Sequence, residues 1–267
     1  MTESRVVRIG LRVATWLVLA FLYVPLVILA IYAFNEGRSQ AWPLSGFGLD
    51  WFVEAAGSTA VRRALLNSVM AASGATAIAL VLGTLAALAV QRFSFFGRDT
   101  ISFLFVLPIA LPGVVTGIAL RTTFQTAGID FGLMTIIVGH ATFCVVVAYN
   151  NVIARLRRLP RSPEEASADL GADTWTTFRR ITLPGMGTAL LSGALLAFAL
   201  SFDEIIVTNF TAGPGTQTIP MWIYSALQRP RELPVVNVVA LVLVVISVVP
   251  VYLAQRIGSS AGGGGRY

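Results

Sequence analysis

Long apolar runs are the feature that most limits what this chain can fold into. Hydrophobic residues occupy 56% of its 267 positions and charged residues only 12%, a balance that is not typical of a soluble domain of this length. A helix needs roughly 20 residues to cross about 30 Å of hydrocarbon. Six runs are long enough, and they are Val13–Phe34, Asn67–Val90, Ile101–Phe124, Leu133–Ile153, Met186–Thr208 and Val235–Ala254.

These runs predict the fold class. Each run is continuously apolar, whereas the strands of a membrane β-barrel alternate between apolar and polar residues. We therefore expect an all-α membrane protein with six transmembrane helices that form a single transmembrane domain over residues 1–267. The first run has no small-residue cleavage site after it, which favours a retained span over a signal peptide.

The distribution of arginine predicts the orientation. All 19 basic residues are arginine. With the N-terminus in the cytoplasm, thirteen of them face the cytoplasm and six face the outside, which is the positive-inside asymmetry. Orientation thus accounts for the net charge of +6, and we expect membrane lipid, not nucleic acid, around this chain. Both termini are predicted to be cytoplasmic.

A polar loop, residues 155–184, separates the fourth and fifth runs. Its first part predicts a short helix, with Ser162 as N-cap, Pro163 in the first helical position and Glu165 completing a capping box. Gly171 is expected to end this helix.

The second part of the loop predicts another helix. Asp173 is a suitable start, and Pro184 is the expected end. Trp175, Phe178 and Ile181 recur on one face between them. A folded, amphipathic pair of helices between membrane spans indicates a docking surface for a soluble partner. The alternative is a loop that lies at the membrane interface without a partner.

The loop also resembles the coupling loop of ABC importer permeases. That pattern is Glu-Ala-Ala, three residues, Gly, nine residues, and Ile-x-Leu-Pro. Here Glu165-Ala166-Ser167 is followed at the same spacings by Gly171 and Ile181, and only Ser167 departs from the pattern. The resemblance implies that the loop contacts an ATP-hydrolysing subunit through Glu164, Glu165, Ala166, Gly171, Ala172, Phe178, Ile181, Leu183 and Pro184.

The resemblance extends over the whole chain, and it is clearest to permeases of the spermidine/putrescine type. The segments at 42–52 and 211–225 are similar to that subgroup, whereas Pro234-Val-Val-Asn237 departs from its usual Pro-Glu-x-Asn. The resemblance implies the type I ABC importer permease (MetI-like) fold, a bacterial inner membrane location and polyamine or related cationic substrates. Opines, amino-acid-like cations, iron and anions are the alternative substrates within the same permease type.

The resemblance further implies several partners. They are a second permease subunit, identical or paralogous, a pair of ABC ATPase subunits, and an extracytoplasmic substrate-binding protein. The chain contains no lysine, so it cannot form a Walker A site, whose lysine reaches the nucleotide phosphates. ATP and magnesium are therefore expected on the partner ATPase, with no cofactor on this chain.

Neither an enzyme nor a metal protein is predicted. No nucleophile motif surrounds a serine, and no paired catalytic carboxylates lie in a soluble segment. The one cysteine, Cys144, lies inside the fourth run, and the one histidine, His140, precedes it by one helical turn. We expect His140 to be a packed, hydrogen-bonded group.

The third run contains two prolines, Pro108 and Pro112, that predict a kink or a break in its helix. Transporters expose backbone to their pathway at broken helices near the membrane centre, so we assign both prolines to the substrate pathway. Plain packing is the alternative. Gly113 and Gly117 form a small-residue pair that predicts close approach of a neighbouring helix.

Asp203 and Glu204 lie at the end of the fifth run. A carboxylate at the centre of a membrane helix costs roughly 2.5–3.5 kcal/mol, so it is rare there without a function or a partner. Adjacent helical residues point about 100° apart, so both cannot face one pathway. We predict that one of them lines the pathway and favours a cation while the other pairs with Arg121 or Arg62, and Tyr224 is a further pathway candidate. Alternatively, both lie near the outer interface in structural hydrogen bonds.

Two other classes of function remain open. An ATP-independent channel or carrier would not need the 155–184 loop, whereas a membrane scaffold would use the loop only to recruit a partner.

Overall fold

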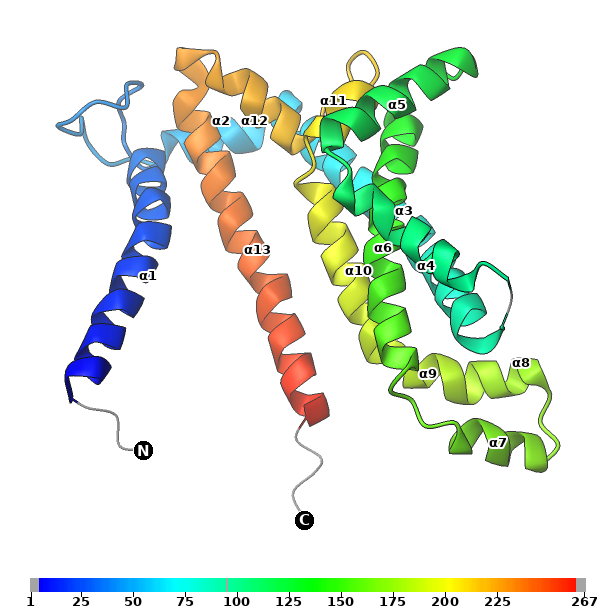
Figure 1. The fold of residues 1–267 in the computed structure, drawn as a ribbon. Helices are drawn as coiled ribbons and strands as arrows, with labels where there is room; N and C mark the ends of the chain where they lie inside the picture. Colours follow the sequence, from blue (N-terminus) through cyan, green and yellow to red (C-terminus); the bar gives the residue numbers. More distant parts are fainter. Residues whose placement is uncertain (1–4, 95, 263–267) are drawn as a thin grey trace. The chain divides into compact units, whose positions relative to one another are not determined.

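The computed structural model describes residues 5–94 and 96–262, and these residues are nearly all helical (Figure 1). In this part of the chain, β-structure is limited to one isolated bridge between Asn35 and Phe47. A helix satisfies its own backbone hydrogen bonds, which is what an apolar environment requires. The predicted all-α class is confirmed.

Contacts divide the chain into two compact units. One unit comprises Met1–Arg62 and Ile223–Val251, and the other comprises Arg63–Trp222 and Tyr252–Tyr267. The prediction of a single domain over residues 1–267 stays a prediction. Three helices run from one unit into the other, namely α3 (Thr59–Arg92), α12 (Ile219–Leu227) and α13 (Leu233–Gly262).

The first unit is organised around a buried asparagine. The side-chain oxygen of Asn35 accepts a hydrogen bond from the backbone N–H of Ser45 at 3.0 Å. The indole N–H of Trp51, which is buried in α2, donates to the backbone carbonyl of Asn35 at 2.9 Å. These bonds shape the connection after the first helix. The other helices that lie wholly in this unit are α1 (Arg5–Ala33), α2 (Asp50–Gly57) and η2 (Pro230–Glu232).

The second unit holds most of the shorter helices. Its central element is α6 (Leu133–Leu156), which contacts α4, α5, α10 and α11. The helices around it are α4 (Arg98–Ala110), α5 (Gly113–Thr126), α10 (Gly187–Phe202) and α11 (Ile206–Thr211). Between α6 and α10 the chain forms α7 (Ser162–Asp169), α8 (Thr174–Thr177), the π-helix η1 (Phe178–Thr182) and α9 (Leu183–Gly185).

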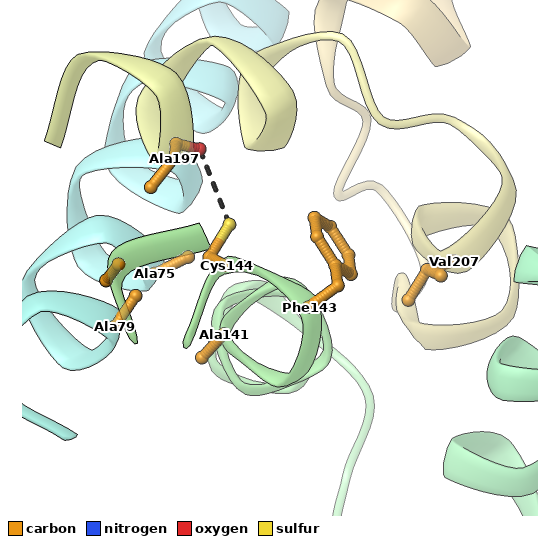
Figure 2. Packing of buried hydrophobic residues seen from close by; sticks show 8 residues of the cluster. Ala75, Ala79, Ala141, Phe143, Cys144, Ala197 and Val207 are labelled. Atoms are coloured by element: carbon orange, nitrogen blue, oxygen red, sulfur yellow. Dashed lines mark hydrogen bonds between the residues drawn. The ribbon is translucent and has the colours of Figure 1, made fainter. Parts of the chain in front are cut away.

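Small side chains form much of the core around α6. Figure 2 shows one cluster in which alanines of α3, α6 and α10 lie around Cys144, whereas Phe143 lies on the side toward Val207 of α11. The thiol of Cys144 donates to the backbone carbonyl of Ala197 at 3.4 Å. Small residues let helix backbones approach closely, and this is how membrane helices gain contact area without a hydrophobic driving force between them.

The spans agree with the sequence in class, and their number is not confirmed. Within the described residues, four helical segments are long and apolar enough to cross a membrane, and the pair Thr174–Gly185 and Gly187–Phe202, bent by 63°, makes a fifth if it is counted as one span. The predicted third span is two helices, α4 and α5, separated by Leu111 in an extended conformation and by Pro112. The predicted break is confirmed, whereas the count of six stays a prediction.

The tightest contact between α3 and α6 gives a prediction about stability. A Cβ atom at Gly83 would lie 2.8 Å from the backbone nitrogen of Tyr149 and 2.9 Å from the carbonyl oxygen of Val145. Backbone cannot rotate away as a side chain can, so Gly83→Ala should destabilise the protein by about 1–3 kcal/mol. The measurement is thermal unfolding of the purified protein in detergent.

The matched control is Gly10→Ala. Gly10 is also inside a helix, α1, and a Cβ atom there would have no neighbour within 4 Å. Both substitutions gain the same intrinsic helix propensity, so the control isolates the steric effect. Equal melting temperatures for the two variants would contradict the close contact.

Candidate functional site

The 155–184 loop begins with a helix that ends as predicted. The helix α7 ends at Asp169, and Gly171 follows with a φ of +79°. That left-handed conformation is available to glycine at little cost and commonly follows the end of a helix. The interpretation of Gly171 as a terminator is confirmed.

The predicted capping box of α7 is wrong. The residue before the helix is Arg161, and no side chain caps it. The backbone N–H groups of Glu164 and Glu165 donate to the carbonyl of Arg161, so the helix begins one residue earlier than the pattern predicted. Ser162 is the first helical residue. Glu164 makes its side-chain contacts elsewhere.

The second helix begins as predicted and ends at Gly185, one residue after Pro184. The carboxylate of Asp173 accepts a hydrogen bond from the backbone N–H of Thr176 at 3.0 Å, which is N-capping. The helical path then continues through η1 and α9 and bends into α10. Pro184 lies one residue before the end of α9 and the 63° bend into α10.

The loop has an exposed side and a packed side. Leu170 and Trp175 are 88% and 64% exposed, and Glu165, Ala166, Leu183 and Pro184 are also exposed. The ring of Phe178 stacks on Trp175 with 5.6 Å between centroids and packs against a buried cluster that includes Val90 of α3. Exposed apolar side chains on a well-anchored element are typical of an interaction surface. Half-buried Ala172 and Ile181 lie between these sides.

Polar side-chain contacts hold the loop together. Arg92, the last residue of α3, contacts both Glu164 and Thr182. Ser167, the one departure from the coupling pattern, hydrogen bonds Thr177 at 2.9 Å and so joins α7 to α8. Arg155 donates from Nε to the carbonyl of Gly185 at 3.0 Å.

Sequence reasoning missed Arg92, Thr177 and Thr182. Their partners lie 10 to 90 positions away, and no local pattern marks such pairs. The one available signal was an arginine at the end of an apolar run.

The two breaks in the apolar helices lie next to each other. Gly113, which follows Pro112, faces Ile206 of α11, where a Cβ atom would be 3.5 Å from its side chain. One turn later, a Cβ atom at Gly117 would lie 3.0 Å from Cγ of Phe210. The predicted close approach at this glycine pair is confirmed. Pro108 is inside α4, and its side chain lies outside the described residues.

The two carboxylates differ in environment. Asp203 follows the last residue of α10 and is exposed. Glu204 is half-buried, and its Oε1 accepts from the backbone N–H of Val207 at 2.9 Å, which caps α11. This bond agrees with the alternative of a structural role for Glu204. Tyr224 is exposed on α12 in the other unit.

His140 joins the two sides of the break between α10 and α11. Its Nδ1 lies 2.7 Å from the hydroxyl of Ser201, and its Nε2 lies 2.8 Å from the hydroxyl of Thr208. The Thr208 hydroxyl donates to the carbonyl of Glu204 at 2.7 Å. His140 is fully buried. As predicted, it is a packed and hydrogen-bonded group.

The cap at Asp173 gives a prediction about pH. Hydrogen bonds from Thr176, from its hydroxyl first and its backbone N–H second, lower the pKa of the Asp173 carboxyl. Because the folded-state pKa is lowered, the cap stabilises α8 fully above the unfolded-state pKa of about 3.9. This stabilisation is lost as the pH falls through the lower, folded-state pKa. Amide exchange at Thr176 should therefore lose protection in that acid range. Asp173→Asn retains a cap that does not titrate, so equal loss in both proteins would contradict this account.

Comparison with known proteins extends these observations. A family model described as "Binding-protein-dependent transport system inner membrane component" matches residues 79–260. The match includes the 155–184 loop and both helix breaks.

Three relatives cover most of the chain. The "Putrescine transport system permease protein PotI" of Escherichia coli (strain K12) is 36% identical over 249 residues, which are 90% of this chain and 88% of the relative. The "Spermidine/putrescine transport system permease protein PotC" of the same strain is 32% identical over 255 residues, with 95% and 94% covered. The "Putative 2-aminoethylphosphonate transport system permease protein PhnV" of Salmonella typhimurium is 29% identical, with 81% and 82% covered.

Solved structures support the fold. A bacterial ABC transporter involved in import of the acidic polysaccharide alginate has a chain that matches with a TM-score of 0.70 at 15% identity, covering 97% of this chain and 99% of that one. A chain of the inward-facing MetNI methionine ABC transporter matches with a TM-score of 0.56 at 17% identity, covering 76% and 98%. By its sequence and its fold, this chain belongs to the family of binding-protein-dependent transport system inner membrane components.

Proposed function

We propose that this chain forms part of the pathway of an ATP-driven importer for spermidine, putrescine or a related cationic amine. The observation that carries this proposal is the 32–36% identity to putrescine and spermidine/putrescine permeases over at least 90% of the chain. The exposed carboxylate of Asp203 beside two broken helices agrees with a cationic substrate, because a fixed negative charge favours cations in a pathway.

The proposed partners are based on the loop and on the family. A pair of ABC ATPase subunits would dock on the exposed side of the 155–184 loop, where Glu165, Leu170 and Trp175 are accessible. They would also bind the ATP and magnesium. A second permease subunit would complete the pathway, and an extracytoplasmic binding protein would deliver the substrate. With both termini in the cytoplasm, the loop lies on the side where ATP is available.

The mechanism that we propose is a change between two conformations. ATP binding would close the ATPase pair and move the docked loops. The loop is packed against α3 and continues into α10, so its movement would shift these helices and open the pathway to the other side. ATP would act by binding the outward-open state more tightly than the inward-open state.

Uptake by cells tests the substrate. Cells that lack this gene should take up labelled spermidine and putrescine more slowly than cells in which the gene is restored, and unlabelled polyamine should compete. Equal uptake with and without the gene would contradict the polyamine proposal. The candidate substrates would then be opines, other amino-acid-like cations, iron or anions such as 2-aminoethylphosphonate.

Asp203→Asn tests the proposed role of the carboxylate. Removing one charge from a hydrated path costs on the order of 1 kcal/mol of attraction, so uptake at low polyamine concentration should fall about fivefold. Co-purification with the ATPase should persist. The matched control is Asp130→Asn, which removes an exposed carboxylate before α6. Unchanged uptake by Asp203→Asn, or an equal loss in the control, would remove Asp203 from the pathway.

A further inference from the structure

Arg92 joins three separate segments at the end of α3. Its Nη2 lies 2.5 Å from Oε1 of Glu164 in the first turn of α7. The same nitrogen donates to the hydroxyl of Thr182, the last residue of η1, at 3.0 Å. The Thr182 hydroxyl in turn donates to Oε1 of Glu164 at 2.5 Å. The three side chains thus form a closed triangle of hydrogen bonds.

The triangle is partly shielded from water. The side chains of Arg92 and Glu164 are each 32% exposed, and Thr182 is 1% exposed. Ion pairs on a fully exposed surface contribute little. A charge-assisted hydrogen bond that is shielded and shares a third, buried partner is stronger and holds a more definite geometry.

The helix α7 depends on this triangle for its attachment to a membrane helix. No residue of α7 is buried. Its other side-chain hydrogen bond in the described part of the chain, between the hydroxyls of Ser167 and Thr177, stays within the loop. By contrast, η1 is also anchored by Phe178, which packs against the buried cluster that includes Val90 of α3. Among the described residues, both halves of the loop reach α3 through Arg92, but only η1 adds an apolar contact of this kind.

The helix α3 is well placed to carry movement away from Arg92. It is one continuous helix of 34 residues. At Gly83 its backbone lies against the backbone of α6 near Tyr149, with no room for a Cβ atom. A closely packed interface transmits displacement because it cannot be compressed. A force on Arg92 therefore reaches both α3 and α6.

We propose that Arg92 is a positioning residue that couples α7 to α3, so that movement of the docked loop is passed to the membrane helices. This inference rests on the proposed function, because it requires a partner ATPase that moves the loop. The roles of the adjacent glutamates are then different. Glu164 connects the loop to its own chain, whereas Glu165 is exposed on the surface offered to the partner.

Arg92→Gln in the full complex tests this inference. The complex of this chain with its ATPase, second permease subunit and binding protein is reconstituted in liposomes, and ATP hydrolysis is measured with and without substrate-loaded binding protein. The variant should retain co-purification with the ATPase and basal hydrolysis. Stimulation of ATP hydrolysis by the binding protein should fall about fivefold or more, which corresponds to the lower end of typical coupling free energies.

The double variant Arg92→Glu with Glu164→Arg, which reverses the ion pair, is the decisive test. The Thr182 hydroxyl can both donate and accept, so it fits the reversed pair, and stimulation should recover. A role confined to folding would show as lost assembly or a lowered melting temperature, which are measured on the same samples. Arg8→Gln, at an exposed position near the start of α1, is the matched control and should behave as the wild type.

The outcomes separate the two proposals. Absence of stimulation in the wild-type complex would overturn the proposed function and, with it, this inference. Wild-type stimulation that Arg92→Gln retains would overturn the inference alone. So would a loss that the reversed pair does not restore, or a loss that merely accompanies reduced assembly.

Discussion

The close approach of backbones around α6 is the contact on which the second unit depends. The side chains of the alanine cluster are small and Gly83 has none, so the backbones of α3, α6 and α10 approach closely there. In a membrane this contact is the main source of helix association, since lipid is as apolar as leucine. This contact also fixes the positions of the helix ends in space. The termini of α3 and α6 thereby set the positions of Arg92 and Arg155, which hold the 155–184 loop.

The helix breaks show how the same unit accommodates irregular backbone. Where α10 ends, free backbone groups need partners that lipid cannot provide. Glu204 and Thr208 supply some of them, and His140 links Ser201 to Thr208 across the gap. The chain thus keeps a non-helical segment whose backbone groups find partners within the protein. Broken helices of this kind are where transporters contact their substrates, and the exposed Asp203 lies in this one.

Local patterns predicted local structure well, and distant contacts poorly. The end of α7 at Gly171 and the start of α8 at Asp173 are explained by the conformational preference of a glycine and by one nearby hydrogen bond. The break at Pro112 is explained by a missing N–H. The triangle at Arg92 joins this arginine to residues 72 and 90 positions away, and only the fold brings them together. The capping box failed because α7 begins one residue earlier than the pattern predicted, with Arg161 in place of Ser162 before the helix.

The π-helical turn η1 makes the winding of the loop as important as its composition. A π-helix accommodates one more residue per turn than an α-helix. Ordinary α-helical winding of the same five residues, Phe178–Thr182, would rotate the residues before the turn by about 100° relative to the residues after it. Trp175 would then leave the exposed side while Thr182 stayed beside Arg92. The π-helical winding of η1 therefore sets the rotation of the exposed surface relative to its anchor, and α-helical winding would misalign the two even if every side chain were retained.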